Sequence, residues 1–150
     1  KSNFYMWNSM GMASSIGLGL AMARPDKKVF VLDGDGAILM NLNSLTTTAA
    51  KAPVNLVHII WDNGQYQITG GQLTHTSGEA DIETIARGAG FKQALTVDTF
   101  TAFKKALSQI LIQPGPWILV VKTDSSKALG RPPKSPVYIK NQFMEGLGNV

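Results

Sequence analysis

Two acidic turns, each preceded by an apolar stretch, contain the side chains most suited to chemistry. Residues 29–32 run into Asp33-Gly34-Asp35-Gly36, and the mostly apolar residues 55–61 run into Asp62-Asn63-Gly64. Carboxylate and amide oxygens are the hard ligands that Mg²⁺ takes. Glycine permits a close backbone approach to a ligand, and the free N–H groups that open a helix suit an anion. We therefore expect Mg²⁺ to bridge these turns to a phosphate group.

The elements predicted between the two turns have matching lengths. A helix over about residues 37–50 rises about 21 Å, and a strand over about residues 55–61 returns about 23 Å. Right-handed crossover makes the strands that precede the two turns neighbours or near neighbours in one parallel sheet. Asn63 is therefore expected beside Asp35, at the carboxyl edge of the sheet where ligands bind.

The spacing of the two turns resembles a known motif. Gly34-Asp35-Gly36, the 25 residues 37–61 and then Asp62-Asn63 are similar to the GDG…NN motif of thiamine diphosphate (ThDP) enzymes. The resemblance implies that ThDP is bound through Mg²⁺, with Asp35, Asn63 and the backbone carbonyl of Gln65 as metal ligands. The first Asn of the family's pair is Asp62 here. This departure changes the local charge but leaves the ligand positions intact.

The resemblance also implies cofactor contacts outside the metal ligands. In ThDP enzymes of the benzoylformate decarboxylase type, the residue that bends the cofactor stands 25 positions before the GDG aspartate, which is Met10 here. A flexible thioether suits that concave place. Plain core packing beside the following helix is the alternative for Met10. The predicted cofactor-binding residues are Ser9, Met10, Gly34, Asp35, Gly36, Ala37, Asn63, Gln65 and Tyr66.

Residues 64–78 form a glycine- and threonine-rich segment without hydrophobic periodicity. A loop of this length in a compact domain is usually functional or mobile. The run 69–74, Thr-Gly-Gly-Gln-Leu-Thr, resembles the GGQxT segment of phosphonopyruvate and sulfopyruvate decarboxylases. Gln72, Thr74 and His75 are therefore candidate substrate contacts, with a solvated side chain as the alternative for His75. His58 lies inside an apolar strand, so we expect a hydrogen-bonded core histidine.

Strand and helix patterns alternate along the chain. This alternation predicts an α/β three-layer sandwich, with a mostly parallel sheet covered by helices on both faces. Asp81 and either Thr99 or Thr101 are predicted helix caps. The length fits a single domain, 1–150, with an extended proline-containing tail from about residue 123. Strands are expected at 4–6, 29–32, 55–61, 92–97 and 117–121, and helices at 16–23, 37–50, 81–89, about 99–113 and 141–147.

Composition and pattern exclude several other classes. The chain has no cysteine, which excludes disulfides and thiolate sites, and its apolar runs are too short to span a bilayer. No signal-peptide pattern opens the sequence, so a cytoplasmic location is expected. The net charge of +4 owes much to the segment from Lys122 onward, where five basic residues face two acidic ones. The bases are spaced apart and prolines interrupt them, which favours a solvated or anion-attracting tail over a nucleic-acid surface.

The resemblance spans nearly the whole chain, because Leu-Gly-Arg-Pro at 129–132 and Phe143-Met144 are similar to the end of the same decarboxylases. It implies Mg²⁺- and ThDP-dependent decarboxylation of a small anionic 2-keto acid, 3-sulfopyruvate or 3-phosphonopyruvate. In this family the activating glutamate lies on a separate pyrimidine-binding domain. The resemblance therefore implies half of a shared active site, in a homodimer or an α₂β₂-like oligomer. Another ThDP reaction, such as acetolactate synthesis or keto-acid oxidation, and a non-catalytic α/β binding module are the alternatives.

Overall fold

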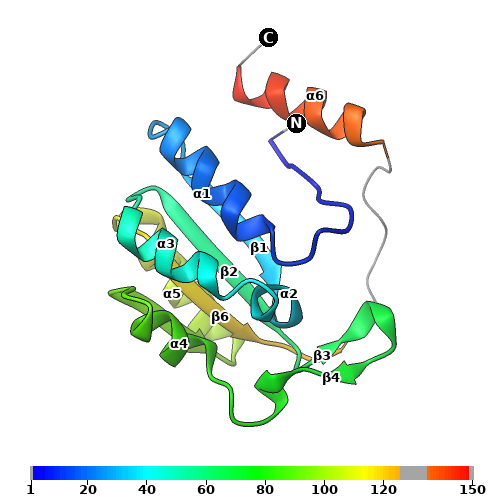
Figure 1. Cartoon of the computed structure of the whole chain (residues 1–150). Helices are drawn as coiled ribbons and strands as arrows, with labels where there is room; N and C mark the ends of the chain where they lie inside the picture. Colours follow the sequence, from blue (N-terminus) through cyan, green and yellow to red (C-terminus); the bar gives the residue numbers. More distant parts are fainter. Residues whose placement is uncertain (1, 126–134, 149–150) are drawn as a thin grey trace. The chain divides into compact units, whose positions relative to one another are not determined.

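A computed structural model describes residues 2–125 and 135–148 of the chain. The chain divides into two compact units, one comprising Lys1–Ser9 and Ser126–Val150 and the other Met10–Ser125. The larger unit, Met10–Ser125, holds both acidic turns and the whole sheet (Figure 1). Residues 126–134 of the predicted extended tail, which include the Leu-Gly-Arg-Pro run at 129–132, lie outside the described residues.

A parallel four-stranded sheet forms the centre of the larger unit. Its strands are β1 (Val29–Gly34), β2 (Leu56–Asp62), β5 (Gln93–Val97) and β6 (Trp117–Lys122), in the order β1-β2-β6-β5. The register places Gly34 opposite Trp61 and Asp62 opposite Lys122. The carboxyl ends of β1, β2 and β6 therefore lie side by side, as the crossover argument predicted for the first two.

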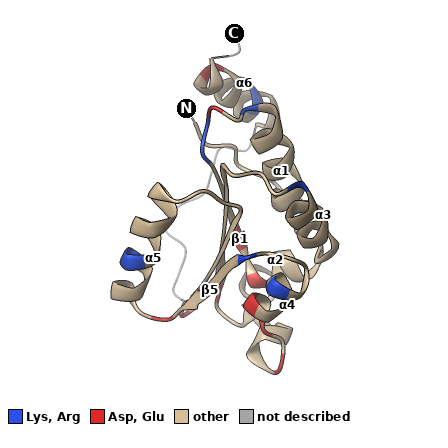
Figure 2. Cartoon of the chain, turned by 90° about the vertical axis from the view of Figure 1, so that its left-hand side faces the viewer, with Lys and Arg blue, Asp and Glu red and all other residues tan. Residues whose placement is uncertain are grey.

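Helices cover both faces of this sheet, which confirms the predicted three-layer α/β sandwich. Figure 2 shows α5 on one side of the strands and α1, α3 and α4 on the other. Ile60 and Ile118 pack with α3 and α4 on one face, and Val57 and Leu119 pack with α5 on the other. The helices of the larger unit are α1 (Ala13–Ala23), α2 (Asp35–Leu39), α3 (Asn43–Lys51), α4 (Ile82–Gly88) and α5 (Phe100–Ile112).

Two helix starts confirm the predicted caps. The Asp81 carboxylate accepts a hydrogen bond from the backbone N–H of Thr84 at 2.5 Å, and α4 begins at the next residue. The Thr99 hydroxyl accepts from the N–H of Ala102 at 3.2 Å, so Thr99 rather than Thr101 caps α5. Both side chains satisfy donors that the first turn of a helix leaves unpaired.

The helix predicted over residues 37–50 is wrong in its continuity, because the structure forms α2 and α3 with a turn between them. The side chain of Asn41 leaves the helical pattern and donates through Nδ2 to the carbonyl of Gly11 at 2.7 Å. The Ser44 hydroxyl donates to the carbonyl of Asn41 at 2.8 Å. Such local side-chain bonds compete with helix continuation.

Residues 64–78 are ordered into short elements rather than the predicted structureless loop. β3 (Gln65–Tyr66) pairs with β4 (Gln72–Leu73) in an antiparallel hairpin, with the 3₁₀ turn η1 (Gln67–Thr69) between them. Gly70 and Gly71 have φ values of 132° and 75°, which L side chains rarely adopt. A second 3₁₀ turn, η2 (His75–Ser77), follows the hairpin.

The smaller unit contains α6 (Pro136–Leu147), which begins earlier than the predicted 141. Pro136 occupies its first turn and Ser135 caps it, a favourable start for a helix. The strand predicted at 4–6 is wrong, since the described residues 2–12 contain no strand. Instead, the ring of Phe4 packs edge-on against that of Phe143, with centroids 5.5 Å apart.

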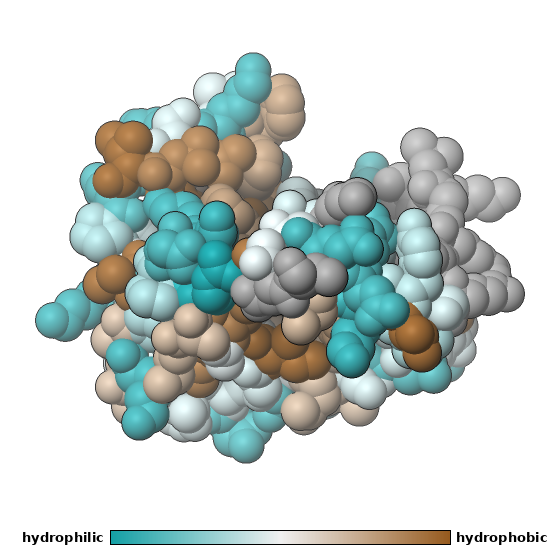
Figure 3. All heavy atoms as spheres, turned by 90° about the horizontal axis from the view of Figure 1, so that it is seen from above, coloured by the Kyte–Doolittle hydropathy of each residue, from teal (hydrophilic) through white to brown (hydrophobic). Residues whose placement is uncertain are grey.

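Hydrophobic side chains remain exposed in both units, among hydrophilic ones (Figure 3). In the larger unit, Val29 and Val31 point from β1 into the core below α1, whereas Phe30 and Leu32 are 41% and 62% exposed. The described part of the chain thus leaves one face of β1 uncovered. No helix in this part is long and apolar enough to cross a membrane.

Candidate metal and diphosphate site

Asp35 stands at the junction of β1 and α2, where the first acidic turn leaves the sheet. The residue is 2% exposed, so its carboxylate needs partners. Oδ2 accepts a hydrogen bond from the hydroxyl of Thr74 at 2.5 Å, and the hydroxyl oxygen of Thr76 lies 3.1 Å from it. Within the described chain, no hydrogen bond reaches Oδ1. One oxygen of Asp35 is therefore held by the protein, and the other is left for a ligand.

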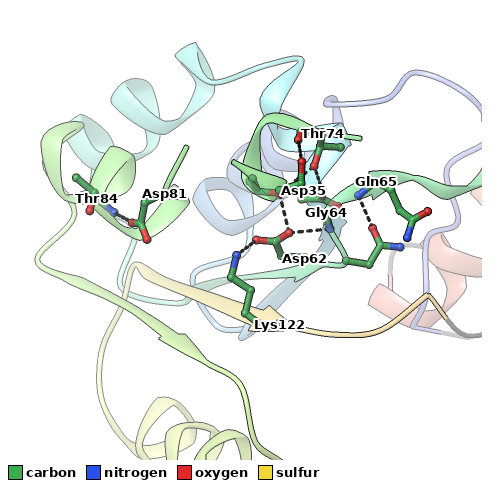
Figure 4. A network of polar contacts seen from close by, with 11 residues as sticks. Asp35, Asp62, Gly64, Gln65, Thr74, Asp81, Thr84 and Lys122 are labelled. Carbon is green, nitrogen blue, oxygen red and sulfur yellow. Dashed lines mark hydrogen bonds and ion pairs between the residues drawn. The ribbon is translucent and has the colours of Figure 1, made fainter. Parts of the chain in front are cut away.

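Asp62, which replaces the family's first Asn, ends β2 and is 3% exposed. Its Oδ1 accepts from the Thr76 hydroxyl at 2.7 Å and from the N–H of Gly64 at 3.1 Å. Its Oδ2 accepts from Nζ of Lys122 at 2.5 Å, in an ion pair between adjacent strands (Figure 4). The lysine compensates the extra negative charge that the departure introduces.

Asn63 is fixed within its own turn. Its Oδ1 accepts from the N–H of Gln65 at 3.1 Å, and its Nδ2 donates to Oε1 of Gln67 at 3.1 Å. A carbonyl oxygen has two lone pairs, so Oδ1 keeps one for a cation. Gln65 itself begins β3, and its side-chain Nε2 donates to the hydroxyl of Ser125. These bonds hold the predicted ligands Asn63 and Gln65 at the carboxyl end of β2.

Gly36 lies under an aromatic ring. A Cβ added to this residue would stand 2.4 Å from Cε1 and 2.6 Å from Cδ1 of Tyr66, and 3.3 Å from Cγ2 of Thr74. A Cβ added to Gly34 would meet nothing within 4 Å. Glycine at position 36 therefore lets Tyr66, another predicted cofactor contact, approach the backbone. Ala37 is half-buried in the same short helix.

The remaining predicted contacts, Ser9 and Met10, are both exposed. Met10 is 45% exposed, so it is not a buried core residue. Ser9 belongs to the smaller unit and has a φ of 55°. Their predicted cofactor contacts stay predictions.

The three candidate substrate residues have unlike surroundings. Gln72 is exposed on the hairpin, where its Nε2 donates to the carbonyl of Thr69 at 3.3 Å. His75 is exposed and lines an open pocket of about 600 Å³ with residues 73–74 and 77–80. Thr74 is buried against Asp35 although it also reaches this pocket wall. The structure therefore brings Thr74, but not Gln72, to the acidic turn.

His58 is buried beneath the first turn, as expected of a hydrogen-bonded core histidine. Its Nε2 lies 3.3 Å from Oδ2 of Asp33, and Oδ1 of Asp33 accepts from the N–H of Gly34 at 3.1 Å. This pair braces the backbone from which Asp35 projects. The buried position of His58 could be predicted from the sequence, but its partner Asp33 could not, because the pairing depends on the register of β1 and β2.

Thr76 and Lys122 were also missed from the sequence. Neither belongs to the motif, and each reaches it only through the fold. Thr76 follows Thr74 by two residues, and Lys122 ends β6 beside Asp62. The spacing of the two threonines was the available signal for Thr76. The single lysine at the end of an apolar strand was the signal for Lys122.

The donor set fits a magnesium-diphosphate group. Asp35 supplies one free carboxylate oxygen, and Asn63 and Gln65 supply neutral oxygens, all hard ligands. Over residues 2–125 and 135–148 no cluster of three or more His, Cys, Asp and Glu side chains forms a cage for a metal. A cation held by so few protein oxygens completes its shell with substrate or cofactor phosphates and water, as Mg²⁺ commonly does.

Known proteins are similar to this chain in sequence. Residues 2–121 match the family described as thiamine pyrophosphate enzyme, C-terminal TPP binding domain. The β subunit of sulfopyruvate decarboxylase from Methanocaldococcus jannaschii is 42% identical over 146 residues, which are 97% of this chain and 77% of that subunit. Phosphonopyruvate decarboxylase from Streptomyces hygroscopicus is 41% identical over 145 residues, which are 95% of this chain and 36% of that enzyme.

A solved structure shares the fold. Transketolase from Campylobacter jejuni superposes with a TM-score of 0.59 and 18% identity, over 75% of this chain and 19% of that one. This likeness concerns the fold alone. The sequence matches carry the assignment, because they extend over almost the whole chain and include both acidic turns. The chain therefore belongs to the thiamine pyrophosphate enzymes, in the family of their C-terminal TPP-binding domains.

Proposed function

We propose that this chain is the diphosphate-binding half of a Mg²⁺- and ThDP-dependent decarboxylase that acts on 3-sulfopyruvate or 3-phosphonopyruvate. Family membership and the names of two relatives, a sulfopyruvate decarboxylase subunit and a phosphonopyruvate decarboxylase, support this choice. The single structural observation that carries it is the buried carboxylate of Asp35, held through Oδ2 and free at Oδ1.

The residues of this chain bind and orient. Asp35, Asn63 and the Gln65 carbonyl would hold Mg²⁺, and the backbone at Gly36 and Ala37 would bind the diphosphate. Met10, Ser9 and Tyr66 would be further contacts to the cofactor. Bound ThDP supplies the electron sink for the electrons that CO₂ leaves behind. The substrate loses CO₂ and takes up a proton to give the corresponding aldehyde.

The proposed active site is shared with another domain. ThDP chemistry needs a carboxylate beside the pyrimidine ring, and the carboxylates Glu79, Glu83 and Glu145 lie outside the acidic turns. The relative from M. jannaschii is named as a β subunit, which implies a heteromeric partner for that protein. We assign the activating carboxylate here to a pyrimidine-binding partner, in a homo- or hetero-oligomer. The cytoplasmic location remains a prediction from the sequence.

The test is an assay of the full-length protein purified with its partner. CO₂ release is measured on a panel comprising 3-sulfopyruvate, 3-phosphonopyruvate, pyruvate and 2-oxoglutarate, with the Asp35→Asn variant beside the natural protein. Release from one of the first two substrates, lost in the variant, supports the proposal. Acetolactate formed from pyruvate would instead indicate another ThDP reaction. Absence of Mg²⁺-dependent ThDP binding would indicate a non-catalytic module.

A further inference from the structure

Two threonine hydroxyls connect the segment after β4 to both acidic turns. Thr74 and Thr76 are 3% and 8% exposed, and their hydroxyl oxygens lie 2.9 Å apart. Both reach Oδ2 of Asp35, and Thr76 also reaches Oδ1 of Asp62. Figure 4 shows this group of polar contacts at the end of β2. No other described side chain makes a hydrogen-bond contact with Asp35.

The number of hydrogens limits how these contacts are made. Each hydroxyl has one hydrogen to donate and two lone pairs to accept with. Two hydrogens must therefore serve four oxygen–oxygen contacts. The shortest distances assign the hydrogen of Thr74 to Asp35, at 2.5 Å, and that of Thr76 to Asp62, at 2.7 Å. Thr74 then directly holds the metal-binding carboxylate, and Thr76 is anchored on the neighbouring strand.

The residue at position 62 must accept hydrogen bonds on both sides. Gly64 and Thr76 donate to Oδ1 of Asp62, and Lys122 donates to Oδ2. Only a carboxylate offers two acceptors here, because an asparagine would turn an NH₂ group toward one set of donors. Asp62 is therefore matched to Lys122, and the change from the family's Asn links β6 to the threonines.

We infer that Thr74 and Thr76, anchored by Asp62 and Lys122, are positioning residues for the metal-binding carboxylate of Asp35. This inference rests on the proposed function, because it assigns a role within the same magnesium site. Thr74 fixes Oδ2 and so sets the direction in which Oδ1 faces the cation, and Thr76 ties the same segment to Asp62. The packing of residues 72–78 against Asp35 and the binding of the metal by Asp35 are thereby coupled. Thr74 acts on the metal ligand rather than on the substrate.

The experiment compares hydroxyl loss with hydroxyl retention in the full-length protein bound to its partner. Thr74→Val removes the hydroxyl at nearly constant volume, and Thr74→Ser keeps it. The Mg²⁺ concentration for half-maximal ThDP binding is measured by calorimetry, and the melting temperature is measured without Mg²⁺ and ThDP. Loss of a residue that orients a metal ligand typically weakens the metal site about tenfold or more. We expect Thr74→Val to raise this Mg²⁺ concentration about tenfold or more and Thr74→Ser to keep it near normal. Thr101→Val, an exposed control on α5, should leave it unchanged.

A double-mutant cycle tests the anchor and remains informative if Thr74→Val fails to fold. Thr76→Val and Asp62→Asn each raise the Mg²⁺ requirement, and the double variant raises it by less than the product of the two, because both act through one hydrogen bond. An unchanged Mg²⁺ requirement in Thr74→Val or Thr76→Val, or independent effects in the cycle, would overturn the inference. A natural protein that binds ThDP without Mg²⁺, or not at all, would instead contradict the proposed function.

Discussion

At the scale of single residues, the two carboxylate oxygens of Asp35 differ in role: Oδ2 is hydrogen-bonded within the protein, and Oδ1 is left for a ligand. Its position could be predicted from the GDG motif, and so could Asn63, because both belong to a short pattern with fixed spacing. Thr76 and Lys122 could not, since they approach from 41 and 60 positions away from Asp35 and Asp62 in the sequence. Long-range partners of this kind depend on strand order and register, which no local pattern states.

Gly36 gives a prediction about space. Alanine at this position places a Cβ inside contact distance of the Tyr66 ring, and overpacking of this kind costs about 1–3 kcal/mol. We expect Gly36→Ala to lower the free energy of unfolding by that amount in urea titrations. Gly34→Ala is the matched control, since its Cβ meets open space and its φ of −105° suits alanine. Equal stabilities of the two variants would contradict the packing described.

Met10 gives a prediction about catalysis. Since it is 45% exposed, its truncation removes little buried surface, and we expect Met10→Ala to leave the melting temperature nearly unchanged. If Met10 supports the bent cofactor, the same variant lowers the rate of CO₂ release. Met12 is also 45% exposed, and Met12→Ala serves as the control. An early-melting Met10→Ala protein with full activity would favour structural packing for this residue.

At the scale of elements, local sequence signals predicted two helix caps but missed Ser135, which caps α6. Asp81 and Thr99 cap α4 and α5 as predicted. The predicted helix over residues 37–50 failed because the Asn41 amide found a partner on another element, the Gly11 carbonyl. The predicted loop over 64–78 failed because a two-residue strand pair, β3 with β4, is too short to give a period.

The Asp81 cap of α4 leads to a prediction about how the stability of the fold depends on pH. The hydrogen bond from the Thr84 N–H lowers the pKa of Asp81. The pKa of Asp81 in the folded protein therefore lies below its value of about 3.9 in the unfolded chain. The ionised cap contributes its full stabilisation above the unfolded pKa, and this contribution is lost as the pH falls through the folded pKa. We expect Asp81→Ala to cost about 1 kcal/mol at pH 7 in urea unfolding, and less in strong acid. Thr101→Val is again the exposed control. A cost that grew as the pH fell would contradict this account.

At the scale of the whole molecule, the chain accounts for only part of a reaction. Its fold class and its family could be predicted from the sequence, because alternating elements and a spaced motif both survive without long-range detail. The residues that would complete the proposed active site could not be, because we propose that they belong to a partner domain. The uncovered face of β1, with Phe30 and Leu32, likewise shows no partner within the described residues.

Purified without a partner, the 150-residue chain should release no CO₂ from any 2-keto acid, because we assign the carboxylate that activates the aminopyrimidine to the partner. Mg²⁺-dependent ThDP binding is expected to persist, though more weakly. The measurement is CO₂ release before and after the pyrimidine-binding partner is added, with the oligomeric state followed by light scattering. Robust turnover by the isolated chain would overturn the shared-site proposal.

The order of the strands also determines when the sheet can form during synthesis. β6 is the last strand in the described part of the sequence, yet it lies between β2 and β5. A nascent chain on the ribosome must therefore wait for residues 117–122 before β5 has any strand to pair with and before Lys122 reaches Asp62. At about 5–20 residues per second, synthesis beyond β2 takes several seconds, during which apolar strands stay exposed. Premature termination before β6 leaves the sheet open, and such fragments are expected substrates for chaperones and proteases.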